Sequence, residues 1–160
     1  MTIRSLAKAL IRHGSAKGIT LATAESCTGG LIAKTLTDVS GSSAVFCGGF
    51  VTYTNEAKQT LLGVDAEIFA RDTEVSHACA KAMAEGARQR LGADVAVSTT
   101  GFAGPTGGTA ADPVGTVYIG ISTPSGVHSE RFCAPAGSTR AQVRAAATKR
   151  ALELLLEIEK

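Results

Sequence analysis

Residues 19–36 read ITLATAESCTGGLIAKTL, and this stretch decides the fold because its pattern changes from that of a strand to that of a helix. Residues 19–24 are apolar or β-branched, as in a short buried strand. Gly29 and Gly30 follow, and the apolar residues of 31–39 then recur at helical spacing. A buried strand that leads into a helix through a short turn is the building unit of a parallel α/β sheet.

The rest of the chain alternates between the same two patterns. Gly14 is expected to end a first helix, and either Asp72 or Thr73 is expected to cap the helix over residues 75–91. Gly48-Gly49 predicts a bulge in its strand. Strands are expected at residues 19–24, 44–53, 95–102, 115–122 and 127–133, and helices at residues 3–12, 31–39, 55–62, 75–91 and from the T-x-x-Q capping box at Thr139 onward.

This order predicts a single α/β domain over residues 1–160, a three-layer α/β/α sandwich whose mostly parallel sheet has one antiparallel strand. The antiparallel pairing comes from a hairpin, because residues 123–126 (TPSG) place Pro and Gly where a type I turn has them. Ligands of such sheets bind beyond the carboxyl ends of the strands. The loops at 25–30, 53–58 and 100–108 are therefore expected to share one site with the start of the last helix.

The composition is that of a globular protein, with 44% hydrophobic and 19% charged residues. A net charge of +2 is too small to indicate nucleic-acid binding, and no basic run is present. No apolar stretch approaches the roughly 18 residues of a membrane span, and the N-terminus does not resemble a signal peptide. We therefore expect a cytoplasmic protein with no nucleic-acid and no membrane partner.

The cysteines and histidines show no spacing typical of a metal site. The four cysteines form no C-x-x-C pair, and we expect free thiols packed as small apolar groups. His13 lies near a helix end, His77 on an exposed helix side and His128 in a hairpin strand. None of the three is well placed for a Ser-His-Asp triad.

Ser26 lies at the turn from strand to helix, where its hydroxyl would project at the edge of the sheet. The backbone amides of Cys27, Thr28, Gly29 and Gly30 would point the same way. Unpaired amides at a helix start stabilise an oxyanion or hold a phosphate. A helix-capping role for Ser26 or Thr28 would explain the same residues, so nucleophile and cap both stay open here.

A serine hydroxyl needs a base before it can attack, and Lys58 is the candidate. Tyr53 ends a predicted strand, and Lys58 follows about one helical turn later. Partial burial would lower the pKa of the lysine, so that its neutral amine accepts a proton. Tyr53 is a candidate to relay that proton or to donate one to the leaving group. A solvated lysine on a helix surface is the alternative.

Two further features indicate a bound anion. Residues 99–109 (TTGFAGPTGGT) are rich in glycine but lack the G-K-[ST] of a P-loop, so a structural turn explains them equally well. Arg140 and Arg144 are spaced i, i+4, and Arg140 falls at the first helical position, where the helix dipole disfavours a cation. A bound phosphate would relieve that conflict, whereas a surface arginine is the alternative.

Together these motifs resemble the CinA C-terminal domain family, whose characterised members include nicotinamide mononucleotide deamidases. The matching stretches are TAESCTGGLIA (23–33), GGFVTYTNEAKQTLLGV (48–64), AEGARQRLGADVAVSTTGFAGPTGGT (84–109), PVGTVYIGIS (113–122) and R-x-x-V-R (140–144). Asp112 and Thr139 depart from the family, which often has a lysine and usually an acidic residue at these positions.

The resemblance implies a mixed five-stranded sheet and a stand-alone form of the domain, without the larger N-terminal domain of full-length CinA proteins. It implies hydrolysis of nicotinamide mononucleotide to nicotinate mononucleotide and ammonia, with no metal and no organic cofactor. Ser26 is implied as the nucleophile, with Tyr53 and Lys58 as its catalytic partners. The substrate-binding positions that we expect are Cys27, Thr28, Gly29, Gly30, Asn55, Thr100, Gly101, Gly104 and Arg140.

Other functions stay open. A non-catalytic nucleotide-binding module that regulates a partner, of the competence/damage-inducible CinA type, would use the same loops and need no Ser–Lys pair. Cys27 as a thiol nucleophile would lack a histidine or a second cysteine to activate it. The expected partner is a small mononucleotide. Among oligomeric states a homodimer is favoured, although the sheet can absorb every apolar helix face.

Overall fold

The computed structural model describes residues 1–158 of the chain. The strands are β1 (Leu21–Glu25), β2 (Phe46–Val51), β3 (Val95–Gly101), β4 (Thr116–Thr123) and β5 (Gly126–Cys133). The helices are α1 (Ile3–Lys17), α2 (Leu31–Thr37), α3 (Asn55–Leu62), α4 (Ala66–Asp72), α5 (His77–Leu91) and α6 (Arg140–Ile158), with a 3₁₀ turn at Ser42–Ala44.

Within residues 1–158, five strands form one mixed sheet in the order β2-β1-β3-β4-β5. β1 runs parallel to both β2 and β3, whereas β4 runs antiparallel to both β3 and β5. The predicted mostly parallel sheet with one antiparallel strand is confirmed. The strand that runs against the other four is β4, however, and not the expected strand 127–133, which as β5 is antiparallel to its neighbour β4 alone. The pairing of β1 with β2 shifts between Leu21–Phe46 and Ala22–Gly48, so Cys47 is the extra residue of a bulge beside the predicted glycine pair.

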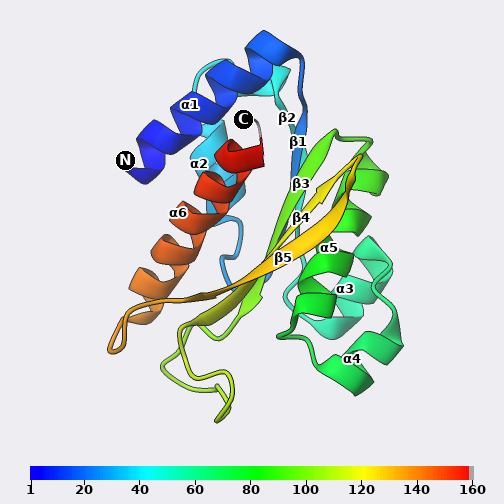
Figure 1. Ribbon diagram of the computed structural model, residues 1–160, viewed down its shortest axis with the longest axis vertical. Helices are drawn as coiled ribbons and strands as arrows, with labels where there is room; N and C mark the ends of the chain where they lie inside the picture. The colour runs from blue at the N-terminus through cyan, green and yellow to red at the C-terminus, as the bar shows by residue number, and fades with distance from the viewer. Residues whose placement is uncertain (159–160) are drawn as a thin grey trace.

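Helices cover both faces of the sheet (Figure 1). α1, α2 and α6 lie on one face, and α3, α4 and α5 lie on the other. The larger core lies under α1 and α6, where Leu10, Ile119 and Leu152 are fully buried. Although α6 is the longest helix, no helix in residues 1–158 has the length and apolar character to cross a membrane.

The second core is built from small residues, and it lets α5 approach α3 closely. A Cβ atom at Gly86 of α5 would lie 2.1 Å from the carbonyl oxygen of Leu62 at the end of α3. Only glycine fits there, so this contact fixes the position of α3 against α5. α3 begins as predicted at Asn55, and its end at Gly63, which adopts a left-handed conformation, is also confirmed.

Two predicted helix boundaries were wrong. α1 continues through Gly14 and ends at Gly18. Gly14 is required by packing, because a Cβ atom there would lie 2.7 Å from a methyl group of Val45. α5 is capped by neither Asp72 nor Thr73: the Ser76 hydroxyl accepts from the amide of Cys79.

The segment before α5 forms α4, a short helix that the apolar pattern did not indicate. The Asp65 carboxylate caps α4 by accepting from the amide of Glu67 at 2.9 Å. Thr73 follows the end of α4 with φ +68°, a strained conformation for a β-branched residue. This turn positions Glu74 and Val75 between the two helices.

The expectation for the cysteines was half right. All four thiols are free, as predicted. Cys27 and Cys79 are buried and pack as small apolar groups, whereas Cys47 and Cys133 are exposed because each lies on an edge strand of the sheet. The predicted capping box of the last helix is confirmed, since Thr139 and Gln142 each accept a hydrogen bond from the other's amide.

Candidate active site

A cavity of about 220 Å³ opens where the chain leaves the carboxyl ends of β1 and β3. This is where a sheet of this type is expected to bind its ligand. The lining residues come from the loop after β1, from the loop after β2, from α3, from the turn before α5, from the end of β3 and the loop after it, and from the start of α6: Ser26, Cys27, Tyr53, Lys58, Glu74, Val75, Thr100, Gly101, Phe102, Ala103, Gly104, Thr106 and Arg140.

Ser26 follows β1 directly and is held by the neighbouring strand. Its amide donates to the carbonyl of Thr99 at 3.0 Å, which continues the pairing of β1 with β3 by one residue. The residue is 9% exposed, and it lines the cavity. The pairing with β3 therefore fixes the backbone of Ser26 where the residue lines the cavity.

Lys58 reaches Ser26 from α3. The Thr54 hydroxyl caps this helix by accepting from the amide of Ala57, and Lys58 follows in the first turn. The Lys58 amine lies 3.1 Å from the Ser26 hydroxyl oxygen and donates to the Thr52 carbonyl at 3.0 Å. Lys58 is 1% exposed and forms no ion pair with any carboxylate in residues 1–158.

The Lys58 amine is biased toward its neutral form. Burial lowers the pKa of Lys58, and the nearby Cys79, Glu74 and Cys27 only partly oppose that shift. A lysine with a lowered pKa beside a serine hydroxyl has the arrangement of a nucleophile and its base. The prediction that residues 26 and 58 meet in one cleft is confirmed by the 3.1 Å contact.

Tyr53 and Arg140 form a second pair on the wall of the cavity. Arg140 donates to the Tyr53 hydroxyl at 2.7 Å and to the Gly104 carbonyl at 2.7 Å. The side chain of Arg140, at the first position of α6, thus finds acceptors that offset its unfavourable place in the helix dipole. Tyr53 is 59% exposed, and its hydroxyl pairs with Arg140 rather than with Ser26 or Lys58.

Arg144 holds the loop that follows Ser26. Its guanidinium donates to the carbonyls of Cys27 at 3.2 Å and Thr28 at 3.0 Å. Because both carbonyls point to α6, the backbone of this loop is fixed from the side opposite Lys58. Arg144 itself does not line the cavity.

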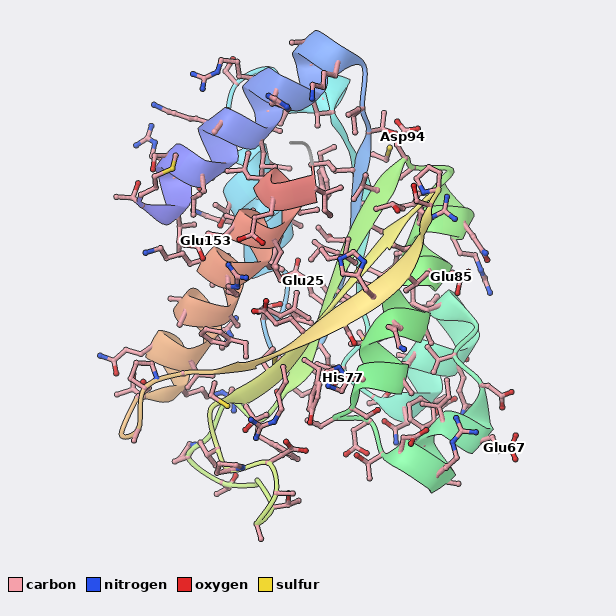
Figure 2. The ribbon with its side chains drawn as sticks, viewed as in Figure 1. Glu25, Glu67, His77, Glu85, Asp94 and Glu153 are labelled. Carbon is pink, nitrogen blue, oxygen red and sulfur yellow. The ribbon has the colours of Figure 1, made fainter. Side chains whose placement is uncertain are left out.

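A buried carboxylate supports the same loop from below. Glu25 is fully buried and accepts from the Thr28 hydroxyl at 2.7 Å and from the amides of Ile32 and Ala33 at 2.8 and 3.0 Å. Figure 2 shows Glu25 in the interior, between the sheet and the layer of α2 and α6. The carboxylate satisfies the amides at the start of α2, so it acts as the cap of that helix.

The predicted substrate-binding residues divide into two groups. Those that line the cavity are Cys27, Thr100, Gly101, Gly104 and Arg140, and those that do not are Thr28, Gly29, Gly30 and Asn55. The Thr28 hydroxyl is committed to Glu25 and Thr99. The Gly29 amide donates to the carbonyl of Ser26 at 3.0 Å, whereas no backbone carbonyl in residues 1–158 accepts from the amides of Cys27 and Thr28.

Cys27 is the weaker candidate nucleophile. Burial raises the pKa of the Cys27 thiol to about 12, so the thiol stays protonated at neutral pH. Of the three histidines, none lines the cavity: the His77 ring contacts the Ser129 hydroxyl at 2.7 Å and packs edge-on against Tyr118.

Five lining residues were not named individually as site residues from the sequence: Glu74, Val75, Phe102, Ala103 and Thr106. Glu74 and Val75 enter the cavity through the turn after α4, which the sequence analysis did not identify. The other three belong to the glycine-rich stretch 99–109, whose predicted role as a ligand loop could have drawn attention to them. Thr100 links the glycine-rich stretch to the turn after α4, because its hydroxyl donates to the Glu74 carbonyl at 2.6 Å.

The positions that depart from the family pattern lie outside the cavity. Asp112 accepts from the Tyr118 hydroxyl and from Arg131, both at 2.9 Å, and so fixes the long loop to the sheet. Thr139 caps α6. In residues 1–158, no group of three or more His, Cys, Asp or Glu side chains is arranged to hold a metal ion.

Residues 3–158 match the CinA C-terminal domain family. A CinA-like protein of Akkermansia muciniphila is 47% identical over 154 residues, which cover 96% of this chain and 37% of that protein. A CinA-like protein of Mycolicibacterium gilvum is 53% identical over 138 residues, covering 86% of this chain and 32% of that protein. The chain therefore spans about a third of the length of these relatives.

Solved structures share the whole fold. The competence/damage inducible protein CihA from Agrobacterium tumefaciens matches with a TM-score of 0.95 and 43% identity, covering 99% of this chain and 96% of that one. A competence-damaged protein (CinA) superfamily protein from Escherichia coli matches with a TM-score of 0.93 and 35% identity, covering 98% of this chain and 90% of that one. Family match, sequence identity and fold agree, and the chain belongs to the CinA C-terminal domain family.

Proposed function

We propose that this chain is an amidohydrolase that converts nicotinamide mononucleotide to nicotinate mononucleotide and ammonia, with Ser26 as the nucleophile. The observation that carries the proposal is the contact of 3.1 Å between the Ser26 hydroxyl and the buried amine of Lys58. A neutral amine at this place accepts the serine proton, because burial lowers the pKa of Lys58. The substrate itself comes from the family resemblance.

In the proposed first half-reaction, the Ser26 hydroxyl passes its proton to the Lys58 amine while its oxygen attacks the carboxamide carbon. The amide of Cys27, a lining residue, is free of backbone partners in the described chain and is a candidate to stabilise the oxyanion, at roughly 3 kcal/mol per donor. The protonated Lys58 then gives its proton to the departing amide nitrogen. The C–N bond breaks, ammonia leaves, and an ester on Ser26 remains.

In the second half-reaction, a water molecule loses a proton to Lys58 and attacks the ester. The carbon–oxygen bond to Ser26 breaks, Ser26 recovers its proton from Lys58, and the carboxylate product leaves. The direct contact makes a relay through Tyr53 unnecessary for the first proton transfer. We assign Tyr53 and Arg140 to the substrate instead, since a guanidinium held on this wall is suited to a phosphate.

The test is ammonia release from nicotinamide mononucleotide by the purified chain and by its Ser26→Ala variant. We expect turnover by the chain and none by the variant, which should keep its circular dichroism spectrum because the mutation removes one oxygen atom. Free nicotinamide and related pyridine nucleotides in the same assay define the substrate range. Full activity of Ser26→Ala would exclude the serine mechanism, and binding without turnover by the unmodified chain would favour a non-catalytic nucleotide-binding module.

A further inference from the structure

One lining residue carries a negative charge that the proposed mechanism does not use. Glu74 lies on the wall of the cavity that holds Ser26 and Lys58. Its side chain forms no hydrogen bond and no ion pair with another residue in the described part of the chain. Its charge nevertheless acts within the cavity, because it raises the pKa of both Lys58 and Cys79. For Lys58 this opposes the effect of burial, which lowers the pKa.

The backbone that carries Glu74 is held in place on both sides. Thr73 adopts φ +68°, and its hydroxyl donates to the Val75 carbonyl at 3.2 Å, while the Ser76 hydroxyl donates to the Thr73 carbonyl at 2.9 Å. The Thr100 hydroxyl donates to the carbonyl of Glu74 itself at 2.6 Å. A strained residue maintained by several hydrogen bonds indicates that the position of the following side chain matters.

The remaining lining residues suit a ligand with charges of both signs. Arg140 and Glu74, one basic and one acidic, both line the cavity. Phe102 is the aromatic residue among the lining residues other than Tyr53, and an aromatic ring attracts a cation. A mononucleotide of a pyridinium base has this distribution, with a negative phosphate and a positive ring.

We propose that Glu74 is a specificity-determining residue, whose carboxylate selects carboxamide substrates that carry a positive charge on the ring. The inference rests on the proposed function and deepens it, since it states which property of the base the cavity recognises. A neutral ring of the same shape would fill the same space without the charge interaction. The discrimination therefore resides in the charge of Glu74 and not in the size of the cavity.

The experiment measures binding by calorimetry in the Ser26→Ala background, where no turnover occurs. The two probes are nicotinamide mononucleotide and benzamide mononucleotide, in which a carbon replaces the charged ring nitrogen. We expect tighter binding of the charged ring. Adding Glu74→Gln should weaken nicotinamide mononucleotide about fivefold and leave benzamide mononucleotide unchanged, a modest effect because the carboxylate is solvent-exposed.

Two further variants make the result specific. Glu74→Asp keeps the charge and should retain part of the preference, whereas a structural role would not separate Asp from Gln by ring charge. Glu67→Gln is the matched control, since Glu67 lies on α4 and points away from the molecule (Figure 2). Equal weakening of both ligands by Glu74→Gln, no change in either, or failure of both ligands to bind would overturn the inference.

Failure of the proposed function gives a different result. If the chain releases no ammonia yet prefers the charged ring in a Glu74-dependent way, the amidohydrolase proposal fails and the inference on Glu74 holds. If ammonia is released and Glu74→Gln leaves the preference for the charged ring intact, the amidohydrolase proposal holds and the inference on Glu74 fails.

Discussion

Glu25 and Lys58 are fully buried on opposite sides of the sheet, and their surroundings differ. Glu25 faces the layer of α1, α2 and α6, where a hydroxyl and two amides satisfy both carboxylate oxygens. Lys58 enters from α3 in the other layer, where its amine contacts one hydroxyl and one carbonyl and has no carboxylate partner in residues 1–158.

The difference distinguishes a buried ionisable group with a structural role, Glu25, from one with a proposed catalytic role, Lys58. The Glu25 carboxylate is committed to one hydroxyl and two amides, so it holds its loop in place. A buried amine with no carboxylate in ion-pair contact is costly to keep protonated, and burial lowers the pKa of Lys58 despite the nearby charge of Glu74, which favours its role as a proton acceptor for its neighbour. Both residues contact the turn from strand β1 to helix α2. Glu25 holds the turn rigid, whereas Lys58 is placed to activate Ser26.

The largest expected effect is the loss of the base. Lys58→Met keeps the length of the side chain but removes the amine, so we expect the rate of ammonia release to fall by about 10³-fold. The fold should persist, because Met fills the same buried space. The control is Lys34→Met, whose lysine lies on the surface of α2 and pairs with Asp38. A Lys58→Met protein within tenfold of the unmodified rate would contradict the role of Lys58.

The second effect is on stability and concerns Glu25. Glu25→Gln preserves the shape but replaces one acceptor oxygen by a donor, leaving one of the amides at the start of α2 unpaired. We expect the free energy of unfolding in urea to fall by about 1–3 kcal/mol. Glu85→Gln is the matched control, because Glu85 lies on the outer side of α5 (Figure 2). Equal stability of the two variants would show that Glu25 is not the structural partner in this comparison.

The third effect is a pH dependence that belongs to Lys58. Burial lowers the pKa of Lys58, so kcat/KM should rise with pH through that lowered value as the amine becomes neutral. Between the lowered pKa and the usual lysine value, the unfolded chain binds more protons than the folded one. Stability should therefore increase with pH in that window, by up to about 1.4 kcal/mol per pH unit.

The measurement is urea unfolding of the unmodified chain and Lys58→Met at a series of pH values. The difference between the two proteins isolates Lys58: as the pH falls from the usual lysine value toward the lowered pKa, the unmodified chain should lose stability relative to Lys58→Met. Parallel stability curves for the two proteins would mean that the amine remains charged in the fold.

The smallest effect comes from an ion pair at the surface. Glu130 on β5 accepts from Arg150 at 2.7 and 2.8 Å, and this contact holds the pKa of Glu130 below its usual value. Both side chains are partly exposed, so Glu130→Gln should lower the free energy of unfolding by less than about 1 kcal/mol at neutral pH. The stabilisation is present above the unfolded pKa and is lost as the pH falls through the folded pKa, so the difference should vanish in acid. A loss as large as that of Glu25→Gln would remove the contrast between buried and exposed charges.

Much of this architecture is visible in local patterns. The change of hydrophobic period at residues 19–36 predicts the first strand, the turn and the helix. Because ligands of such sheets bind beyond the carboxyl ends of the strands, the loops after β1 and β3 are then predicted to share a site with Lys58. These inferences succeed because they depend on residues close together in the chain. The capping box at Thr139 and the helix end at Gly63 succeed for the same reason.

The failures depend on contacts between distant residues. Gly14 resembles a helix end in the sequence, but it is needed where Val45 packs against the helix. Glu74 enters the cavity only because Thr73 bends the chain and Thr100 of β3 holds the carbonyl. The pairing of Tyr53 with Arg140 joins positions 87 residues apart, and no local pattern predicts such a contact.

Helix α6 covers the core, and the two arginines in its first two turns also hold two loops of the site in place. Arg140 holds the glycine-rich loop through Gly104, and Arg144, one turn later, holds the loop of the nucleophile. A single inserted residue before Arg140 would leave this spacing intact, whereas one inserted between them would rotate one guanidinium by roughly 100° relative to the other. The spacing of one helical turn thus sets where the glycine-rich loop and the loop of the nucleophile are held relative to each other.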